Sequence, residues 1–134
     1  MLPSGLPDEV AANEPLARFL TSDSQFNQSM AKPAAFMPGP TDSKTSVFRQ
    51  ASQPVDLLWE TADREIKGRR VRAAAMLAAA DVRQAKLDVE AHEPPARHAN
   101  IVGWPTTSGD PALTKARCKE FALLLAQAAD LVRR

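Results

Sequence analysis

The sequence predicts a single α+β domain, in which a small antiparallel or mixed sheet of about four to five short strands packs against two or three helices. Three observations predict it. Two segments carry apolar residues at helical spacing, and several short segments between prolines and glycines alternate in polarity. The 134 residues, 44% of them hydrophobic, are also enough for one core. Two prolines and a glycine predict a flexible tail over residues 1–7, so the domain covers residues 8–134.

Two helices are indicated most clearly. Pro54 opens the first, whose apolar stripe runs down one helical face over residues 55–66 and ends at Gly68. Asp110 is the expected N-cap of a long C-terminal helix with Pro111 at its first position. Its apolar stripe runs from Cys118 to Val132, and Arg133 and Arg134 follow at the end of the helix dipole.

The two main helices predict one shared hydrophobic core. Both stripes need a sheet face to cover, so we expect a single cluster made of Val47, Leu58, Trp59, Phe121 and Leu125. Shorter helical pieces are expected after the N-cap Asp8 and over Leu16–Leu20, where Leu16, Phe19 and Leu20 have i, i+3, i+4 spacing.

Strands are expected in the rest of the chain. Prolines on both sides of Ala34–Met37 favour an edge strand. It would form a hairpin with Thr45–Gln50, where Val47 and Arg49 share one face and Ser46 and Phe48 the other. Alanines favour helix over residues 69–83, but alternation favours a strand up to about Ala78, followed by a turn or helix through Val82. Two further strands are expected at residues 87–89 and 98–104.

Composition predicts a soluble, cytoplasmic protein with no membrane partner. The first residues lack the basic start and apolar run of a signal peptide, and the longest apolar stretch, residues 71–80, is short and interrupted by Arg72. Cys118, the single cysteine, excludes an intramolecular disulfide and falls on the apolar stripe, so we expect it in the core. A net charge of +1 gives no global basic footprint for nucleic acid.

One set of polar residues is expected to form a ligand site. His98 begins a strand and is the candidate catalytic acid or base. If its strand lies beside residues 45–50, Arg49 and Arg97 would converge with it on an anion such as phosphate, because arginine offers two parallel donors. Ser46 would add a hydroxyl group.

Other candidate sites are weaker. His92, Glu93 and His98 match no standard zinc spacing, so the sequence predicts neither a metal nor a cofactor. Lys67, Arg69, Arg70 and Arg72 form a basic cluster around Gly68, either a phosphate-binding patch or a solvated helix end.

Four runs of the sequence resemble those of a family of small uncharacterised proteobacterial proteins. The runs are RFL at 18–20, KPAAFMP at 32–38, SVFR at 46–49 and HANIVGWP at 98–105. The family has no established activity, so the resemblance implies no site residue. It implies a bacterial source and an accessory or defence-type multi-gene system.

Two functions fit these observations. The leading hypothesis is a non-enzymatic binding module that acts with a protein partner, because no catalytic motif is present and residues 34–37 would offer a strand edge. The alternative is a small enzyme or binder acting on a phosphate-bearing ligand, a nucleotide or RNA, with Arg49, Arg97 and His98 at its site.

Overall fold

The computed structural model describes residues 2–134 and confirms an α+β fold. Its sheet has six antiparallel strands in the order β4-β5-β2-β1-β3-β6. None of the helices in this range has the length and apolar character needed to cross a bilayer. The elements are, in chain order, β1 (Pro15–Leu20), the 3-10 helix η1 (Pro33–Ala35), β2 (Thr45–Arg49), α1 (Val55–Glu65), β3 (Ala73–Ala78), α2 (Ala79–Gln84), β4 (Asp88–Ala91), β5 (His98–Val102), α3 (Pro111–Ala128) and β6 (Asp130–Arg133).

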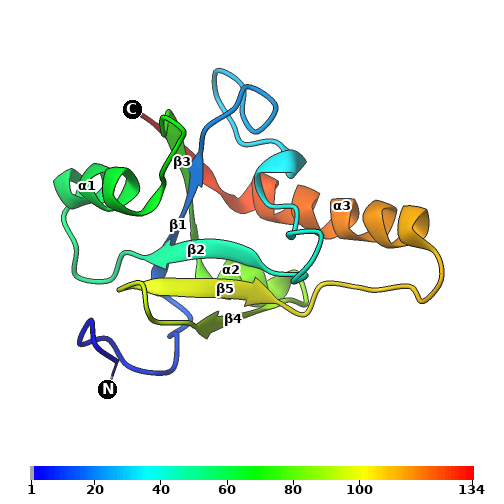
Figure 1. The fold of residues 1–134 in the computed structure, drawn as a ribbon, viewed down its shortest axis with the longest axis horizontal. Coiled ribbons are helices and arrows are strands. Elements are labelled where there is room, and N and C mark those ends of the chain that lie inside the picture. The colour runs from blue at the N-terminus through cyan, green and yellow to red at the C-terminus, as the bar shows by residue number, and fades with distance from the viewer. Residues whose placement is uncertain (1) are drawn as a thin grey trace.

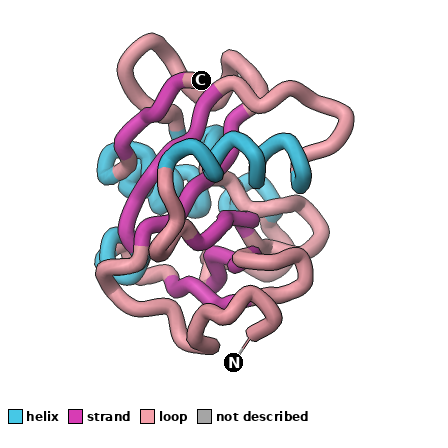
Figure 2. The backbone as a smooth tube through the Cα atoms, turned by 90° about the vertical axis from the view of Figure 1, so that its left-hand side faces the viewer, coloured by secondary structure: helices cyan, strands magenta, loops and turns pink. Residues whose placement is uncertain are grey.

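Helices cover the two faces of the sheet unequally. The long helix α3 lies behind the strands in Figure 1, whereas α1 lies on the viewer's side, and the side view of Figure 2 shows strands between them. The larger core cluster lies on the α3 face and includes Val47 and Leu125, while the smaller one lies under α1 and includes Leu58. The expectation of one shared cluster was therefore wrong. Trp59 and Phe121 are only partly buried, each against a different cluster.

The segment expected as a second helical piece, Leu16–Leu20, is instead the central strand β1. It pairs with β2 on one side and β3 on the other. Both faces are covered, with Leu16 and Leu20 packed on the α3 side and Ala17 and Phe19 on the α1 side. A strand buried on both faces is apolar without alternation, and such a run can imitate helical spacing. The helix expected after Asp8 is also absent, because residues 8–14 form bends and turns.

The expected edge strand at Ala34–Met37 is not a strand either. Residues 33–35 form the 3-10 helix η1, which begins at a proline and packs against α3. Phe36, directly after it, is fully buried in the larger cluster. The expected hairpin with Thr45–Gln50 therefore does not form, and β2 pairs with β1 and β5 instead.

The chain end also differs from the expectation. Asp110 caps α3 as expected, its side chain accepting a hydrogen bond from Leu113 N at 3.0 Å. The helix ends at Ala128, however, and residues 130–133 form β6, which pairs with the free edge of β3. Arg133 and Arg134 thus belong to a sheet edge and not to a helix end. Leu124 on the expected stripe is 48% exposed, because α3 buries a different set: Cys118, Ala122, Leu125 and Ala126.

The middle of the chain follows the expectations closely. The helix over residues 55–66 is present as α1, and the ambiguous alanine-rich segment is β3 up to Ala78 followed directly by α2. The strands expected at residues 87–89 and 98–104 are β4 and β5, which pair with each other. Residues 2–7, expected as a loose tail, are hydrogen-bonded to the domain: Ser4 Oγ donates to the Glu93 carboxylate at 2.6 Å. Met1 lies outside the described residues.

The packing of α3 predicts a contrast between two adjacent leucines. Leu125 is fully buried, so Leu125→Ala should lower the free energy of unfolding by about 2–5 kcal/mol, because apolar burial is reduced and a cavity remains. Leu124→Ala removes the same atoms from an exposed site and should change it by less than about 1 kcal/mol. Urea denaturation of both variants measures the difference, and equal decreases would contradict this packing of α3.

Candidate functional site

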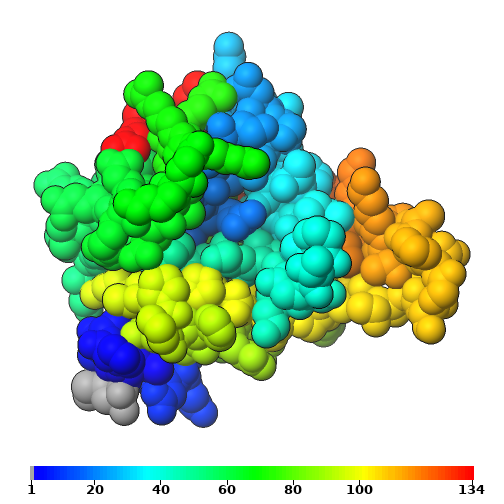
Figure 3. Space-filling view, in the orientation of Figure 1, coloured from blue at the N-terminus to red at the C-terminus, as the bar shows by residue number. Residues whose placement is uncertain are grey.

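One half of the sheet is open on the α1 side. The smaller cluster under α1 covers β1, β3 and the near end of β2, but includes no residue of β4 or β5. Strand register puts Ser46 opposite Asn100, and Phe48 opposite His98, so these four side chains share the α1 side of the sheet. In Figure 3 this face is hollowed between the α1 segment (green), β5 (yellow) and the loop before β2 (cyan). Ser46, His98 and Asn100 are the polar residues of β2 and β5 on this face, whereas Thr45 and Arg49 alternate to the other.

Ser46 and His98 form a short hydrogen bond across the two strands. Ser46 Oγ lies 2.6 Å from His98 Nε2, and His98 Nδ1 lies 2.8 Å from the backbone oxygen of His92. A carbonyl oxygen can only accept, so Nδ1 must carry the proton of this second bond. In the neutral ring Nε2 is then an acceptor, and the Ser46 hydroxyl donates to it. His98 Nδ1 also lies 3.2 Å from Nδ1 of His92. The structure thus brings together two of the expected site residues, Ser46 and His98.

The imidazole of His98 is held on several sides. Its ring makes edge-on contacts with Phe48 and with His92, at centroid distances of 5.4 and 5.2 Å. Partial burial lowers the pKa of His98 below its usual value, and the nearby His92 adds to this. The hydrogen bond to the His92 carbonyl and the charge of Glu65 act in the opposite direction. The net effect is a pKa below the usual value, which favours the neutral ring.

Arg49 does not join this pair. Its side chain is fully buried and forms an ion pair with Glu14, with Nη2 donating to Glu14 Oε1 at 2.8 Å and Nε to Oε2. Further donor groups point to the backbone oxygens of Pro7 and Glu9 at 2.8 and 3.4 Å. As the alternation of β2 predicts, Arg49 lies on the face opposite Phe48 and His98. Its guanidinium group is thus bound by other groups of the same chain.

Arg97 lies next to His98 but is also used within the fold. Nη1 donates to the backbone oxygens of Ala51 and Arg49, at 2.9 and 3.3 Å. Its backbone oxygen accepts from Arg49 N at 2.8 Å, and its φ of 68° places it in the left-handed region at the turn into β5. The expected convergence of Arg49, Arg97 and His98 on one anion is therefore not the arrangement in the structure.

The residues weighed for a metal are also committed elsewhere. The Glu93 carboxylate accepts hydrogen bonds from Ser4 and from Arg97 N. Burial raises the pKa of this carboxyl, but these hydrogen bonds outweigh it and the net pKa is lowered. Nowhere in residues 2–134 do three or more His, Cys, Asp or Glu side chains gather as a metal site would require.

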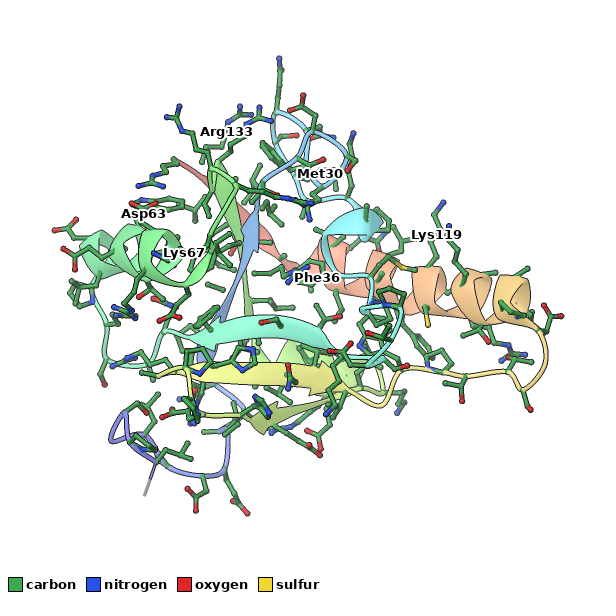
Figure 4. All side chains as sticks on the ribbon, in the orientation of Figure 1. Met30, Phe36, Asp63, Lys67, Lys119 and Arg133 are labelled. Carbon is green, nitrogen blue, oxygen red and sulfur yellow. The ribbon has the colours of Figure 1, made fainter. Side chains whose placement is uncertain are left out.

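A cluster of four arginines surrounds a second, polar pocket. This arginine pocket, about 300 Å³ in volume, is lined by Arg70, Arg72, Arg133 and Arg134 with Phe26 and Val71. Two segments distant in sequence meet there, because β6 pairs with β3 and puts Arg133 opposite Ala73. Figure 4 shows nitrogen-tipped side chains gathered around the labelled Arg133. The sequence indicated the half of the cluster near Gly68, but not the half that β6 contributes.

Two of the four guanidinium groups of the arginine pocket are paired with a carboxylate, and two are not. Arg72 and Arg133 lie over the Phe26 ring, at 5.3 and 5.6 Å from its centroid, and Arg134 lies 5.4 Å from that of Trp59. Asp23 pairs with Arg72 at 2.6 Å, and Asp63 binds Arg134 through both oxygens. In the part of the chain described, no carboxylate pairs with Arg70 or Arg133. The pocket thus keeps a positive charge.

A third site is an apolar groove of about 800 Å³ on the α3 side. Its walls are residues 37–43, which follow η1, and residues 104–115 at the start of α3, and it includes four prolines and Trp104. Cys118 also lines it but is only 4% exposed, as expected for a core position. Burial raises the pKa of the Cys118 thiol, which disfavours the reactive thiolate.

Comparisons with known proteins give no relative of this chain. No protein-family model, curated protein or solved structure matches it. Its function must therefore be inferred from the geometry of its own residues.

The buried Arg49–Glu14 pair predicts a large effect on stability. Glu14→Ala leaves a buried guanidinium group without its counter-charge and should lower the free energy of unfolding by about 3–5 kcal/mol. Asp23→Ala removes the partner of Arg72 from a site where the carboxylate is 85% exposed, and should cost less than about 1 kcal/mol. Thermal or urea unfolding of the two variants measures the difference in the free energy of unfolding. A small decrease for Glu14→Ala would show that Arg49 is free to serve a ligand.

Proposed function

We propose that this protein is a binding module for a phosphate-bearing ligand of the nucleotide or RNA class, and that the arginine pocket is its site. The observation that carries the proposal is a polar pocket lined by four arginines, of which Arg70 and Arg133 have no carboxylate partner among residues 2–134. Arginine donors match phosphate oxygens in pairs, and guanidinium planes also stack on nucleobases. The ligand is thus the one expected in the alternative hypothesis from the sequence, bound at another place.

The charge distribution supports a local site. The net charge of the chain is only +1, so attraction of a polyanion must come from one patch. Lys67 and Arg69 are exposed and lie in the turn that leads to Arg70, which extends the basic surface beyond the pocket. A patch that touches several phosphates would bind a single strand more tightly than a lone phosphate. We place this binding in the cytoplasm, in keeping with the single unpaired cysteine.

Binding of a labelled single-stranded RNA, measured by fluorescence anisotropy over a range of salt concentrations, tests the proposal. Arg70→Gln/Arg133→Gln should weaken binding and reduce the slope of log K against log salt by about 0.7 for each phosphate that the variant no longer neutralises. Inorganic phosphate and a mononucleotide, used as competitors, show how much of the affinity needs a polymer.

The matched control is Lys119→Gln, which removes one charge from the exposed face of α3, far from Arg133 in Figure 4. It should leave the affinity and the salt slope unchanged. The proposal fails if the wild-type protein binds no RNA, nucleotide or phosphate. It also fails if Lys119→Gln, per charge removed, weakens binding as much as the double variant.

The apolar groove favours a second candidate, a protein partner. Residues 34–37 offer no strand edge to which a partner could bind. The apolar groove, whose wall begins at Met37, is the surface that supports a partner instead. A groove of this volume with proline, methionine and tryptophan walls fits an extended apolar peptide segment of another protein. Lys115 and Asp110 at its rim would fix the direction of that segment.

A groove-filling substitution tests this candidate. Thr106→Arg puts a bulky charge on the groove wall and should abolish binding of a partner captured from a bacterial lysate, as measured with the purified pair by calorimetry. Gln84→Arg introduces the same charged side chain at the exposed end of α2 and should leave that binding intact. If Thr106→Arg binds as well as the wild type, the partner does not use the groove.

A further inference from the structure

We propose that Ser46 is a nucleophile activated by His98, and that this pair on the open half of the sheet hydrolyses small carboxylic esters. This activity is separate from phosphate binding at the arginine pocket, which shares no residue with it. It assigns a covalent role to Ser46 and a proton-transfer role to His98.

The geometry has the three parts that an activated serine requires. The nucleophile and base are in contact, with Ser46 Oγ at 2.6 Å from His98 Nε2. The third part is the backbone oxygen of His92, which lies 2.8 Å from His98 Nδ1, where it can accept the proton of that nitrogen and orient the ring. In familiar serine hydrolases a carboxylate holds this third position, and a carbonyl dipole is a weaker substitute. We therefore expect slow turnover and an acyl-enzyme that accumulates.

The backbone at Ser46 is fixed as well. Arg18, from the neighbouring strand β1, donates from Nη1 to the Ser46 carbonyl oxygen at 2.9 Å and from Nε to Ala35 O at 2.8 Å. Phe48 lies two residues along the strand and packs against both Phe19 and the His98 ring. The serine is thus held on a hydrogen-bonded strand and is half-buried.

Asn100 is placed to stabilise the charge that develops on the acyl oxygen. It is the cross-strand partner of Ser46 and its side chain lies on the same face. It is 8% exposed. An amide N–H beside the nucleophile is the kind of donor that supports a tetrahedral intermediate.

The proposed reaction has two steps, acylation of Ser46 and hydrolysis of the acyl-enzyme. Ser46 Oγ attacks the acyl carbon while its proton passes to His98 Nε2. The bond from the acyl carbon to the leaving oxygen breaks, and His98 returns the proton to the departing alcohol. Water then gives a proton to Nε2 and its hydroxyl group adds to the acyl carbon. The bond to Ser46 breaks, and the proton returns to Oγ as the free acid leaves.

Incubation of the full-length protein with p-nitrophenyl acetate tests the proposal. The wild type should release a burst of p-nitrophenol and gain one acetyl group, which tandem mass spectrometry should locate on Ser46. Ser46→Ala should abolish the burst because it removes the atom that is acylated, and His98→Gln should reduce the burst at least about tenfold, a conservative value for the removal of general base catalysis. Ser108→Ala, at an exposed serine in the loop before α3, should behave as wild type.

The pH dependence gives a second measurement. The burst rate should rise with pH as His98 loses its proton, with a midpoint below about 6.5, the ordinary pKa of histidine. His92 from the turn after β4 and Glu65 from α1 are the other titratable groups that act on the ring. A wild-type acetyl group found only on lysines, or no burst above that of Ser46→Ala, would overturn the proposal. The adduct position is read on the wild-type chain, so the test stands even if a variant fails to fold.

Discussion

The buried ion pair between Arg49 and Glu14 holds together four parts of the chain. Arg49 ends β2, and Glu14 directly precedes β1. The same guanidinium group binds the backbone of the N-terminal segment at Pro7, and the Arg49 backbone exchanges hydrogen bonds with Arg97 at the start of β5. Two charges buried together are costly to separate, so the pair fixes where these segments cross. The same strand, β2, carries Ser46, which meets His98 of the neighbouring β5.

The unequal cover of the sheet explains where the polar sites lie. On one face α3, α2 and η1 enclose the larger cluster, while on the other face a single helix covers about half of the strands. The strands β4 and β5 are left open there, and their side chains can be polar. Ser46, His98 and Asn100 are in this open half, whereas Arg49 alternates to the enclosed side and must be paired.

Local patterns predicted those elements whose environment is one-sided. The helix at residues 55–65, the capped start of α3 and the strand β4 each have an exposed face, whereas β2 and β5 are mostly buried and were indicated by alternation in β2 and by Gly103 and Pro105 after β5. The run Pro15–Leu20 is buried on both faces, so its spacing carried no information about strand or helix. The pattern of α3 appeared to continue into Leu131 because an edge strand beside a helix also has apolar residues. Long-range pairing, which the sequence does not contain locally, decided these segments.

Some residues of the candidate sites could be predicted from their residue type, and others could not. Ser46 and His98 were identified by residue type, and strand pairing brings them together. The partner of Arg49 lies 35 positions earlier in the chain, and the His92 contact uses a backbone atom, so neither has a signal in residue spacing. The basic run near Gly68 was visible, but its completion by Arg133 and Arg134 depends on β6.

The last strand belongs both to the fold and to the arginine pocket. β6 is a four-residue edge strand, hydrogen-bonded on one side only, and such strands open more readily than the centre of a sheet. An anion bound between Arg72 and Arg133 would hold β6 against β3. It would stabilise the state in which β6 is paired, by an amount that grows with the concentration and affinity of the anion. The pairing of β6 with β3 and the occupancy of the pocket are therefore thermodynamically linked, and amide exchange in β6 reports on both.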